Sequence, residues 1–283
     1  MLVPRAWPLT PQLSSASRGS IRVMGAGRMP VVFFGHGSPM NVIDDNRYTQ
    51  AWREIGRSVP RPRAILSISA HWFAPGVGVT AMDAPKTIHD FYGFPKELYA
   101  LRYPAPGDPS VARQVRELLA PVDVALDQEW GLDHGTWSVL LHAYPAADVP
   151  VVQLGIDSTQ PGPFHYELGR RLAPLREQGI LIAGSGNVVH NLALRSRDER
   201  APPHDWAARF NSRVRELIER REHAPLVEWE GMGRDAHLAI NSSEHYLPLL
   251  YCLGARGDGE PGRFAVDGLE QGSLGMLTVV FGG

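Results

Sequence analysis

Cysteine is nearly absent from this chain of 283 residues, in which Cys252 is the only one. A single thiol excludes an internal disulfide framework and any zinc or iron–sulfur site that needs several cysteines. Long apolar runs are also missing, since none approaches the roughly 18 residues of a membrane-spanning helix. Neither sign of charge dominates, because 28 Lys and Arg face 30 Asp and Glu. We therefore expect neither a nucleic acid nor a membrane as a partner.

Acidic residues are missing from the start of the chain, where the first carboxylate is Asp44. Residues 1–28 carry four arginines and several serines, which resembles a transit peptide, but no continuous apolar segment of a secretory signal follows. Lysine is scarce throughout and arginine replaces it, as in GC-rich genomes, where over-extended reading frames are common. We predict a disordered or mis-annotated leader over 1–28, with a targeting role as the alternative. One domain over 29–283 should follow, in a cytoplasmic protein.

Short apolar runs alternate with amphipathic stretches along the rest of the chain. Residues 30–37, 64–72 and 179–189 are rich in β-branched and aromatic residues and indicate buried strands. Helical periodicity is clear in segments such as 163–179 and 204–221. This alternation predicts an α/β domain with a largely parallel central sheet that helices cover on both faces. In such sheets, sites lie at the carboxyl ends of the strands.

Eleven histidines are the chemical surplus of the sequence. His36, His71 and His190 each stand at or just after the end of a predicted strand, so three strands would bring three imidazoles into one cleft. A single histidine of this kind is more often a core or rim residue than a ligand, but independent structural roles would not explain a shared position. His245 opens a predicted helix and could face the same strand ends, with a capping or surface role as its alternative. Imidazoles without cysteine suit Zn, Fe, Cu or Ni rather than Mg or Ca.

Two further histidines stand beside predicted helices or loops. His134 lies between Asp133 and Gly135, where the Asp could orient its ring or the three residues could form a simple turn. His89 lies in an aromatic, proline-rich loop suited to a flat ring, and a structural role is equally open. We place His165 on the polar side of a helix. The histidines for which we expect structural roles are His142, His165, His204, His223 and His237.

Signatures of other enzyme classes are missing. There is no HExxH helix of a zinc protease, and Ser38 in GHGSPM lacks the G-x-S-x-G elbow of a serine hydrolase. The turn GSGNVV has no Lys-Ser/Thr continuation of a phosphate loop. Metal chemistry at imidazoles is therefore the favoured hypothesis.

Six motifs occur in a diagnostic order: GHGSPMN, SAHWF, TIHDFYGFP, LDHGTW, GSGNVVHNL and EHYLPLLY. Over Pro30 to Phe281 the chain resembles the DODA-type 4,5-DOPA extradiol dioxygenases, which belong to the class III (LigB-like) extradiol ring-cleavage dioxygenases. The resemblance implies a single three-layer α/β/α domain, a LigB-like catalytic domain over 29–283. It also implies an oxidoreductase that opens a catechol ring beside the diol with both atoms of O₂. One divalent ion is expected, Fe(II) for activity or Zn(II) as the bound metal.

The resemblance extends to single residues of the metal site. His36, His71 and His245 match metal-binding histidines of the family. His190 matches a histidine described either as a fourth metal ligand or as the catalytic base. An all-imidazole set departs from the two-His, one-carboxylate set of many Fe(II) oxygenases. Glu244, beside His245, is therefore an alternative third ligand for the iron form.

The remaining implied roles concern protons and the substrate. His134 matches a second acid–base histidine, which Asp133 could hold in place, and His89 would contact the substrate. The expected partners are a catechol such as DOPA and O₂. Two alternatives on the same fold are a zinc-dependent hydrolase, in which metal-bound hydroxide acts, and a non-enzymatic metal-binding protein. Oxygen consumption would separate the dioxygenase from both.

Overall fold

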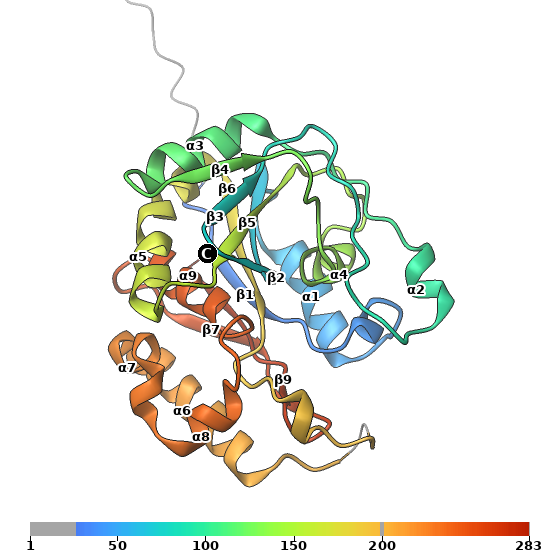
Figure 1. The fold of residues 1–283 in the computed structure, drawn as a ribbon, viewed down its shortest axis with the longest axis vertical. Coiled ribbons are helices and arrows are strands. Elements are labelled where there is room, and N and C mark those ends of the chain that lie inside the picture. The colour runs from blue at the N-terminus through green and yellow to red at the C-terminus, as the bar shows by residue number, and fades with distance from the viewer. Residues whose placement is uncertain (1–26, 199–200, 283) are drawn as a thin grey trace, which may run out of the picture.

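The computed structural model describes residues 27–198 and 201–282 (Figure 1). The predicted leader over 1–28 lies outside these residues except for its last two positions, so it stays a prediction. Arg28 forms ion pairs with Glu177 at 3.1 Å and with Glu260 at 3.6 Å. Met29 is buried against the core.

Within the described residues, eight strands form one sheet in the order β4-β3-β5-β2-β6-β1-β10-β7. Its central strands β5, β2, β6 and β1 are parallel to one another, which confirms the predicted α/β class with a largely parallel sheet. A short pair, β8 and β9, lies apart from this sheet. The strands are β1 Val31–Gly35, β2 Ala64–Ala74, β3 Val77–Thr80, β4 Val124–Asp127, β5 Val151–Asp157, β6 Ile180–Gly186, β7 Gly262–Val266, β8 Leu269–Glu270, β9 Leu274–Gly275 and β10 Thr278–Phe281.

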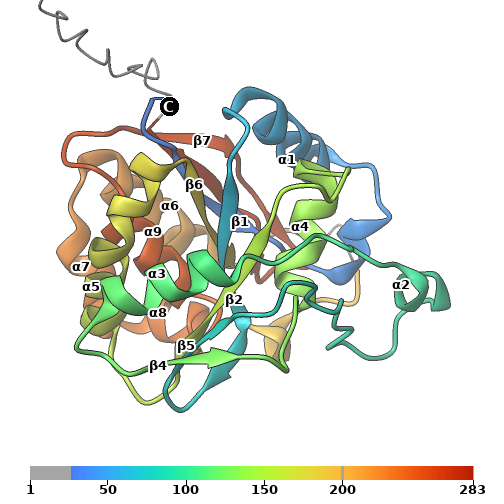
Figure 2. The same ribbon diagram turned by 90° about the horizontal axis from the view of Figure 1, so that it is seen from above.

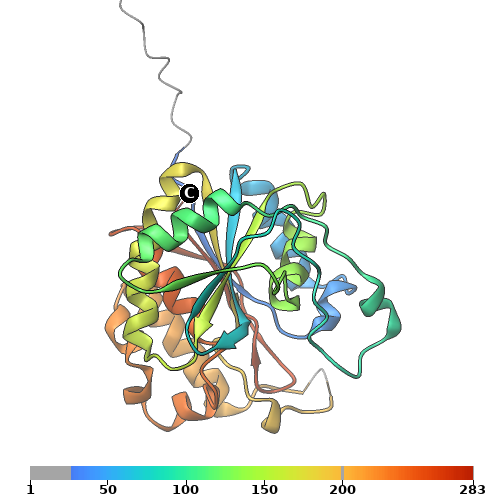
Figure 3. The ribbon, with the colours of Figure 1, turned by 45° about the horizontal axis from the view of Figure 1, so that its top comes forward.

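Helices cover both faces of the sheet, and the twisted strands run between the two helical layers in Figures 2 and 3. One layer comprises α1 (Arg47–Ser58), α2 (Lys96–Ala100) and α4 (His134–Ala143). The other comprises α3 Pro109–Leu119, α5 Gly162–Leu172, α6 Asp205–Arg220, α7 His223–Val227, α8 Arg234–Ala239 and α9 Leu247–Ala255. Short 3₁₀ turns are η1 Pro39–Val42, η2 Ala173–Gln178, η3 Leu192–Leu194 and η4 Trp229–Met232. The predicted three layers are thus present.

The central strand β1 shows why the sheet needs helices on both sides. Successive side chains of a strand point to opposite faces. Val32 and Phe34 pack into the cluster that holds Trp52 of α1, whereas Val31 and Phe33 pack into the cluster on the other face. All four side chains are fully buried. The uninterrupted apolar run of β1 therefore reflects burial on both faces.

The helix expected over 163–179 is shorter than predicted. Helix α5 ends at Leu172 and the 3₁₀ turn η2 follows it. Pro174 lacks the N–H that would continue the α-helical ladder. His165 was placed on the polar side of this helix, and that placement is wrong: its side chain is fully buried between α5 and α9. Both ring nitrogens are bonded there, to the Tyr251 hydroxyl and the Gln160 carbonyl.

Candidate active site

The first pair of histidines lies at the carboxyl ends of β1 and β2. His36 directly follows β1, and His71 lies in the last third of β2. Strand β6 separates these two parallel strands, so their carboxyl ends lie at one edge of the sheet. Gly37 has a φ of +62°, a left-handed conformation that glycine adopts at little cost, and it turns the chain away directly after His36.

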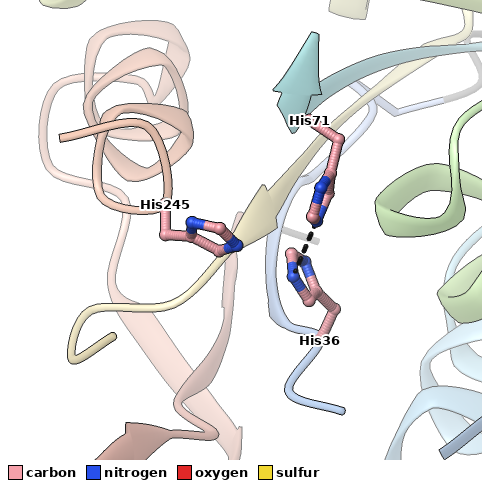
Figure 4. A group of neighbouring side chains, drawn as sticks. All are labelled: His36, His71 and His245. Atoms are coloured by element: carbon pink, nitrogen blue, oxygen red, sulfur yellow. Dashed lines mark hydrogen bonds between the residues drawn. The ribbon is translucent and has the colours of Figure 1, made fainter. Parts of the chain in front are cut away.

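A third histidine completes a compact cluster. His245 lies two residues before α9, which begins at Leu247 with a proline in its first turn. His36, His71 and His245 each offer a nitrogen within 4.8 Å of the others, and Figure 4 shows the three rings converging. The Nε2 atoms of His36 and His71 are 3.3 Å apart. The structure thus brings together three of the four histidines proposed as metal ligands.

The ring of His36 is fixed by a hydroxyl from β6. Its Nδ1 lies 2.9 Å from Ser185 Oγ. That hydroxyl donates its own proton to the carbonyl of Gly135. Ser185 therefore accepts from His36, which places the proton of His36 on Nδ1 and leaves the lone pair of Nε2 facing the cluster.

Carboxylates stand behind the other two rings. Glu244 Oε1 lies 3.0 Å from His245 Nδ1, and the same oxygen accepts from Ser242 Oγ at 2.8 Å. Asp90 Oδ2 lies 3.3 Å from His71 Nδ1. Glu244, which the sequence offered as an alternative third ligand, thus contacts Nδ1 of His245. A carboxylate on Nδ1 favours the tautomer whose Nε2 is free to bind a metal.

The inward nitrogens of the cluster face one another. The Nε2 atoms of His36 and His71 are in hydrogen-bond contact at 3.3 Å, and because the proton of His36 is on Nδ1, its Nε2 is the acceptor in this contact. Burial, and then the neighbouring His245 and His134, hold the pKa of His36 well below its ordinary range. Burial also lowers the pKa of His245. Neutral imidazoles converging on one point fit a divalent transition metal such as Fe(II) or Zn(II).

Electrostatics keep Glu244 ionised. Burial raises the pKa of its carboxyl, but the His245 ring and the Ser242 hydroxyl more than offset this, and the pKa falls to about 2. A charged carboxylate on Nδ1 strengthens the other ring nitrogen of His245 as a metal ligand.

His190 occupies a different position from the other three. It follows the end of β6 by four residues, and its ring stacks on His245 at a centroid distance of 3.5 Å and an interplanar angle of 9°. Its nitrogen groups with Glu244 and His245 rather than with the cluster of three. Burial, and then His245, lower the pKa of His190 to about 3. Its role as a fourth ligand or as a base stays a prediction.

His134, the first residue of α4, lies on the opposite side of the cluster. Its ring is buried, with its centroid 3.9 Å from that of His71. Its Nδ1 lies 3.0 Å from Asp90 Oδ1, at ion-pair distance although the ring N–H is not aligned on that oxygen. The expectation that Asp133 orients this ring is wrong. Asp133 caps α4 by accepting from the Thr136 amide, as N-cap carboxylates do.

Asp133 belongs to a buried polar network beneath the site. Its side chain is fully buried, and it accepts from Ser69 Oγ at 2.7 Å and from the amide group of Gln153. Burial, and then the charge of Asp90, raise the pKa of Asp133 to about 6. The network joins α4 to strands β2 and β5.

His89 lies in the predicted aromatic loop, with its ring against Phe91, Tyr99 and Trp137. Its Nε2 is 3.0 Å from the Leu101 carbonyl. Contact with a substrate stays a prediction. Sequence reasoning missed its neighbour Asp90, which reaches two histidines. The signal was present in the motif TIHDFYGFP, directly after His89.

A family model described as the catalytic LigB subunit of aromatic ring-opening dioxygenase matches residues 31–282. The chain belongs to this LigB family. Its resemblance to the DODA-type members is confirmed by two relatives, each called 4,5-DOPA dioxygenase extradiol. The one from Escherichia coli (strain K12) is 51% identical over 92% of this chain and 97% of its own length. The one from Beta vulgaris is 40% identical over 80% of this chain and 86% of its own.

The LigB fold is shared by a solved structure. The crystal structure of an uncharacterized protein from Escherichia coli K12 matches with a TM-score of 0.79 at 46% identity, covering 90% of this chain and all of the other. Together these relatives make the chain an extradiol dioxygenase, an oxidoreductase that acts on a catechol-type substrate with O₂. The family uses a metal, and the histidine cluster is a possible site for it. Among the described residues, no helix is both long and apolar enough to cross a membrane.

Proposed function

We propose that this LigB enzyme opens the ring of a catechol such as DOPA at one metal ion held by His36, His71 and His245. The convergence of three imidazoles within 4.8 Å carries this proposal. Fe(II) bound there would supply the redox chemistry that combines O₂ with the catechol, whereas Zn(II) would bind without it. DOPA is proposed because the two relatives described above are named for it. A cytoplasmic location stays part of the proposal.

Two histidines flanking the cluster are proposed to move protons. His190 would accept the proton of a catechol hydroxyl, as a neutral imidazole can at pH 7. A fourth ligand position is its alternative role. His134, on the other side of the cluster, would deliver a proton when the O–O bond breaks. The side chain of His89, which lies in the same loop as Asp90, is proposed to contact the substrate ring.

The test is metal-specific oxygen consumption. The protein is stripped of metal and reloaded anaerobically with Fe(II) or Zn(II), and L-DOPA or plain catechols are added with air. We expect O₂ uptake and a yellow ring-opened product with Fe(II) but not with Zn(II). His36→Ala should lose both bound metal and turnover, whereas His237→Ala, whose side chain is exposed on α8, should retain both.

One outcome would overturn this proposal. If protein that demonstrably holds iron shows neither O₂ uptake nor a ring-opened product with any catechol, ring cleavage is refuted. Hydrolysis of esters or amides under nitrogen would then separate the zinc-dependent hydrolase from a non-enzymatic metal-binding protein.

A further inference from the structure

We propose that Asp90 is a positioning residue that fixes His71 and His134 together, with one carboxylate oxygen serving each ring. Its Oδ2 lies 3.3 Å from His71 Nδ1 and its Oδ1 lies 3.0 Å from His134 Nδ1. One side chain thus connects a proposed metal ligand to a proposed proton donor. The inference rests on the proposed function, because it concerns the same site.

The backbone before Asp90 is tied to the start of α4. Thr87 forms a parallel bridge with Leu132, and the Ile88 amide donates to the Leu132 carbonyl at 2.7 Å. The indole N–H of Trp137, in the first turns of α4, donates to the Ile88 carbonyl at 2.8 Å. These bonds hold the loop against the helix that carries His134. The position of the Asp90 carboxylate therefore does not depend on its own contacts alone.

The residues on both sides of Asp90 are anchored as well. The His89 ring bonds to the Leu101 carbonyl, and the Phe91 side chain is buried beside the His134 ring, at a centroid distance of 5.4 Å. The Asp90 side chain is 21% exposed, so it is partly buried. A backbone anchored on both sides holds its carboxylate beside the two rings.

The start of α4 also holds the charge of Asp90. The backbone N–H of His134 donates to Asp90 Oδ1 at 2.9 Å. An anion at a helix amino terminus is stabilised by the unpaired N–H groups of the first turn. The two oxygens of the Asp90 carboxylate thus lie beside one ring nitrogen each, and the helix start holds Oδ1 in place.

Carboxylate chemistry explains why a single residue can serve two histidines. An ionised Asp has two acceptor oxygens, whereas an Asn of the same shape has one acceptor and one donor group. With Asp90, both His71 and His134 can keep their proton on Nδ1 and their lone pair on Nε2. With Asn, only one ring can do so, and the other must change tautomer or lose its partner.

Asp90→Asn is therefore the decisive variant. Its Zn(II)-loaded form would be labelled with ¹⁵N-histidine, and the ring nitrogens of His71 and His134 would be followed by NMR at pH 7.5. We expect Nδ1–H tautomers for both rings in the parent protein and a changed tautomer for one of them in the variant. Zn(II) affinity, from chelator competition, should fall by about 10- to 100-fold, as for other groups that orient metal ligands. Asp235→Asn, which removes a partly exposed carboxylate on α8 that is paired with Arg209, should match the parent in both measurements.

A double-mutant cycle tests the connection to His134 in the Fe(II) enzyme. Asp90→Asn and His134→Gln should each lower kcat, and the double variant should be no slower than His134→Gln, because residues that act as one unit are not additive. If Asp90→Asn does not fold, Asp90→Glu keeps both oxygens on a longer stem and should show both Nδ1–H tautomers. Loss of either tautomer in a folded Asp90→Glu protein would contradict the role.

The two proposals fail in different ways. Altered tautomers and weakened Zn(II) binding in a protein that cleaves no catechol would support Asp90 and refute the proposed function. An active parent enzyme whose Asp90→Asn variant keeps both tautomers and its Zn(II) affinity would refute Asp90 and leave the proposed function intact. Additive losses of kcat in the cycle would likewise overturn the link to His134.

Discussion

Replacing the buried His165 should destabilise the protein by an amount that depends on pH. The ring is fully buried, with Nδ1 3.1 Å from the Tyr251 hydroxyl and Nε2 3.2 Å from the Gln160 carbonyl. Because a carbonyl only accepts, Nε2 carries the proton and Nδ1 accepts from Tyr251. His165→Gln removes the titrating ring while keeping a polar group of similar length.

The magnitude follows from proton linkage. Burial lowers the pKa of His165 from 6.5 to about 4. The unfolded chain therefore binds a proton below pH 6.5 that the folded chain binds only near pH 4. Stability from the neutral ring is fully present above pH 6.5 and is lost as the pH falls toward 4. Between pH 7.5 and pH 5 this loss amounts to about 2 kcal/mol.

Urea unfolding of both proteins at the two pH values measures this directly. The free energy lost in His165→Gln should be about 2 kcal/mol smaller at pH 5 than at pH 7.5, since glutamine does not titrate. Titration of the other histidines cancels in this difference. Fe(II)-dependent turnover at pH 7.5 should stay unchanged, because the ring lies between α5 and α9. The exposed His237→Gln should cost little at either pH. An equal penalty at both pH values for His165→Gln would refute the reasoning.

Three further predictions concern the metal centre. Ser185→Ala should weaken Zn(II) binding by about 10- to 100-fold, because His36 loses the acceptor on Nδ1, and unchanged affinity in chelator competition would contradict this. Glu244→Ala should weaken Zn(II) binding similarly, because His245 loses its partner on Nδ1. Glu244→Gln keeps an acceptor oxygen and should lose less Zn(II) affinity than Glu244→Ala. Equal losses of affinity in the two variants would argue that charge rather than hydrogen bonding matters. Zn(II) at 100 times its Kd should stabilise the folded protein by about 2.7 kcal/mol, seen as a higher Tm that chelation reverses, and a Tm insensitive to metal would exclude binding to the folded state.

The fold was predictable from the sequence because strand burial leaves a local signature. The run 30–35 is apolar at every position, and this alone indicates a strand covered on both faces. Whether a strand runs parallel or antiparallel to its neighbour leaves no such local pattern in the sequence. Residues 273–281 form one apolar segment in the sequence, but its separation into β9 and β10, with β10 antiparallel to β1, depends on pairing with residues far away in the chain.

The site shows the same division between local and distant information. His36 and His71 were placed together correctly because a strand end is a local feature and parallel strands end at one edge. The sequence suggests Asp133 as one possible partner of His134, because the two residues are adjacent, with a simple turn as the alternative. The structure instead places Asp90 there, 44 positions away, while Asp133 bonds to its own helix. Adjacency along a chain says little about which acceptor a ring nitrogen meets.

The place of β1 between β6 and β10 bears on how the protein is made. During translation β1 emerges first, but its neighbours comprise residues 180–186 and 278–281. Strand β1 therefore lacks both neighbours until residue 186 has been synthesised, and it lacks the second neighbour until residue 281. Contacts so distant in sequence slow folding and leave strand edges open to aggregation. We expect the nascent chain to depend on chaperones until release, and truncation before β10 to yield insoluble protein.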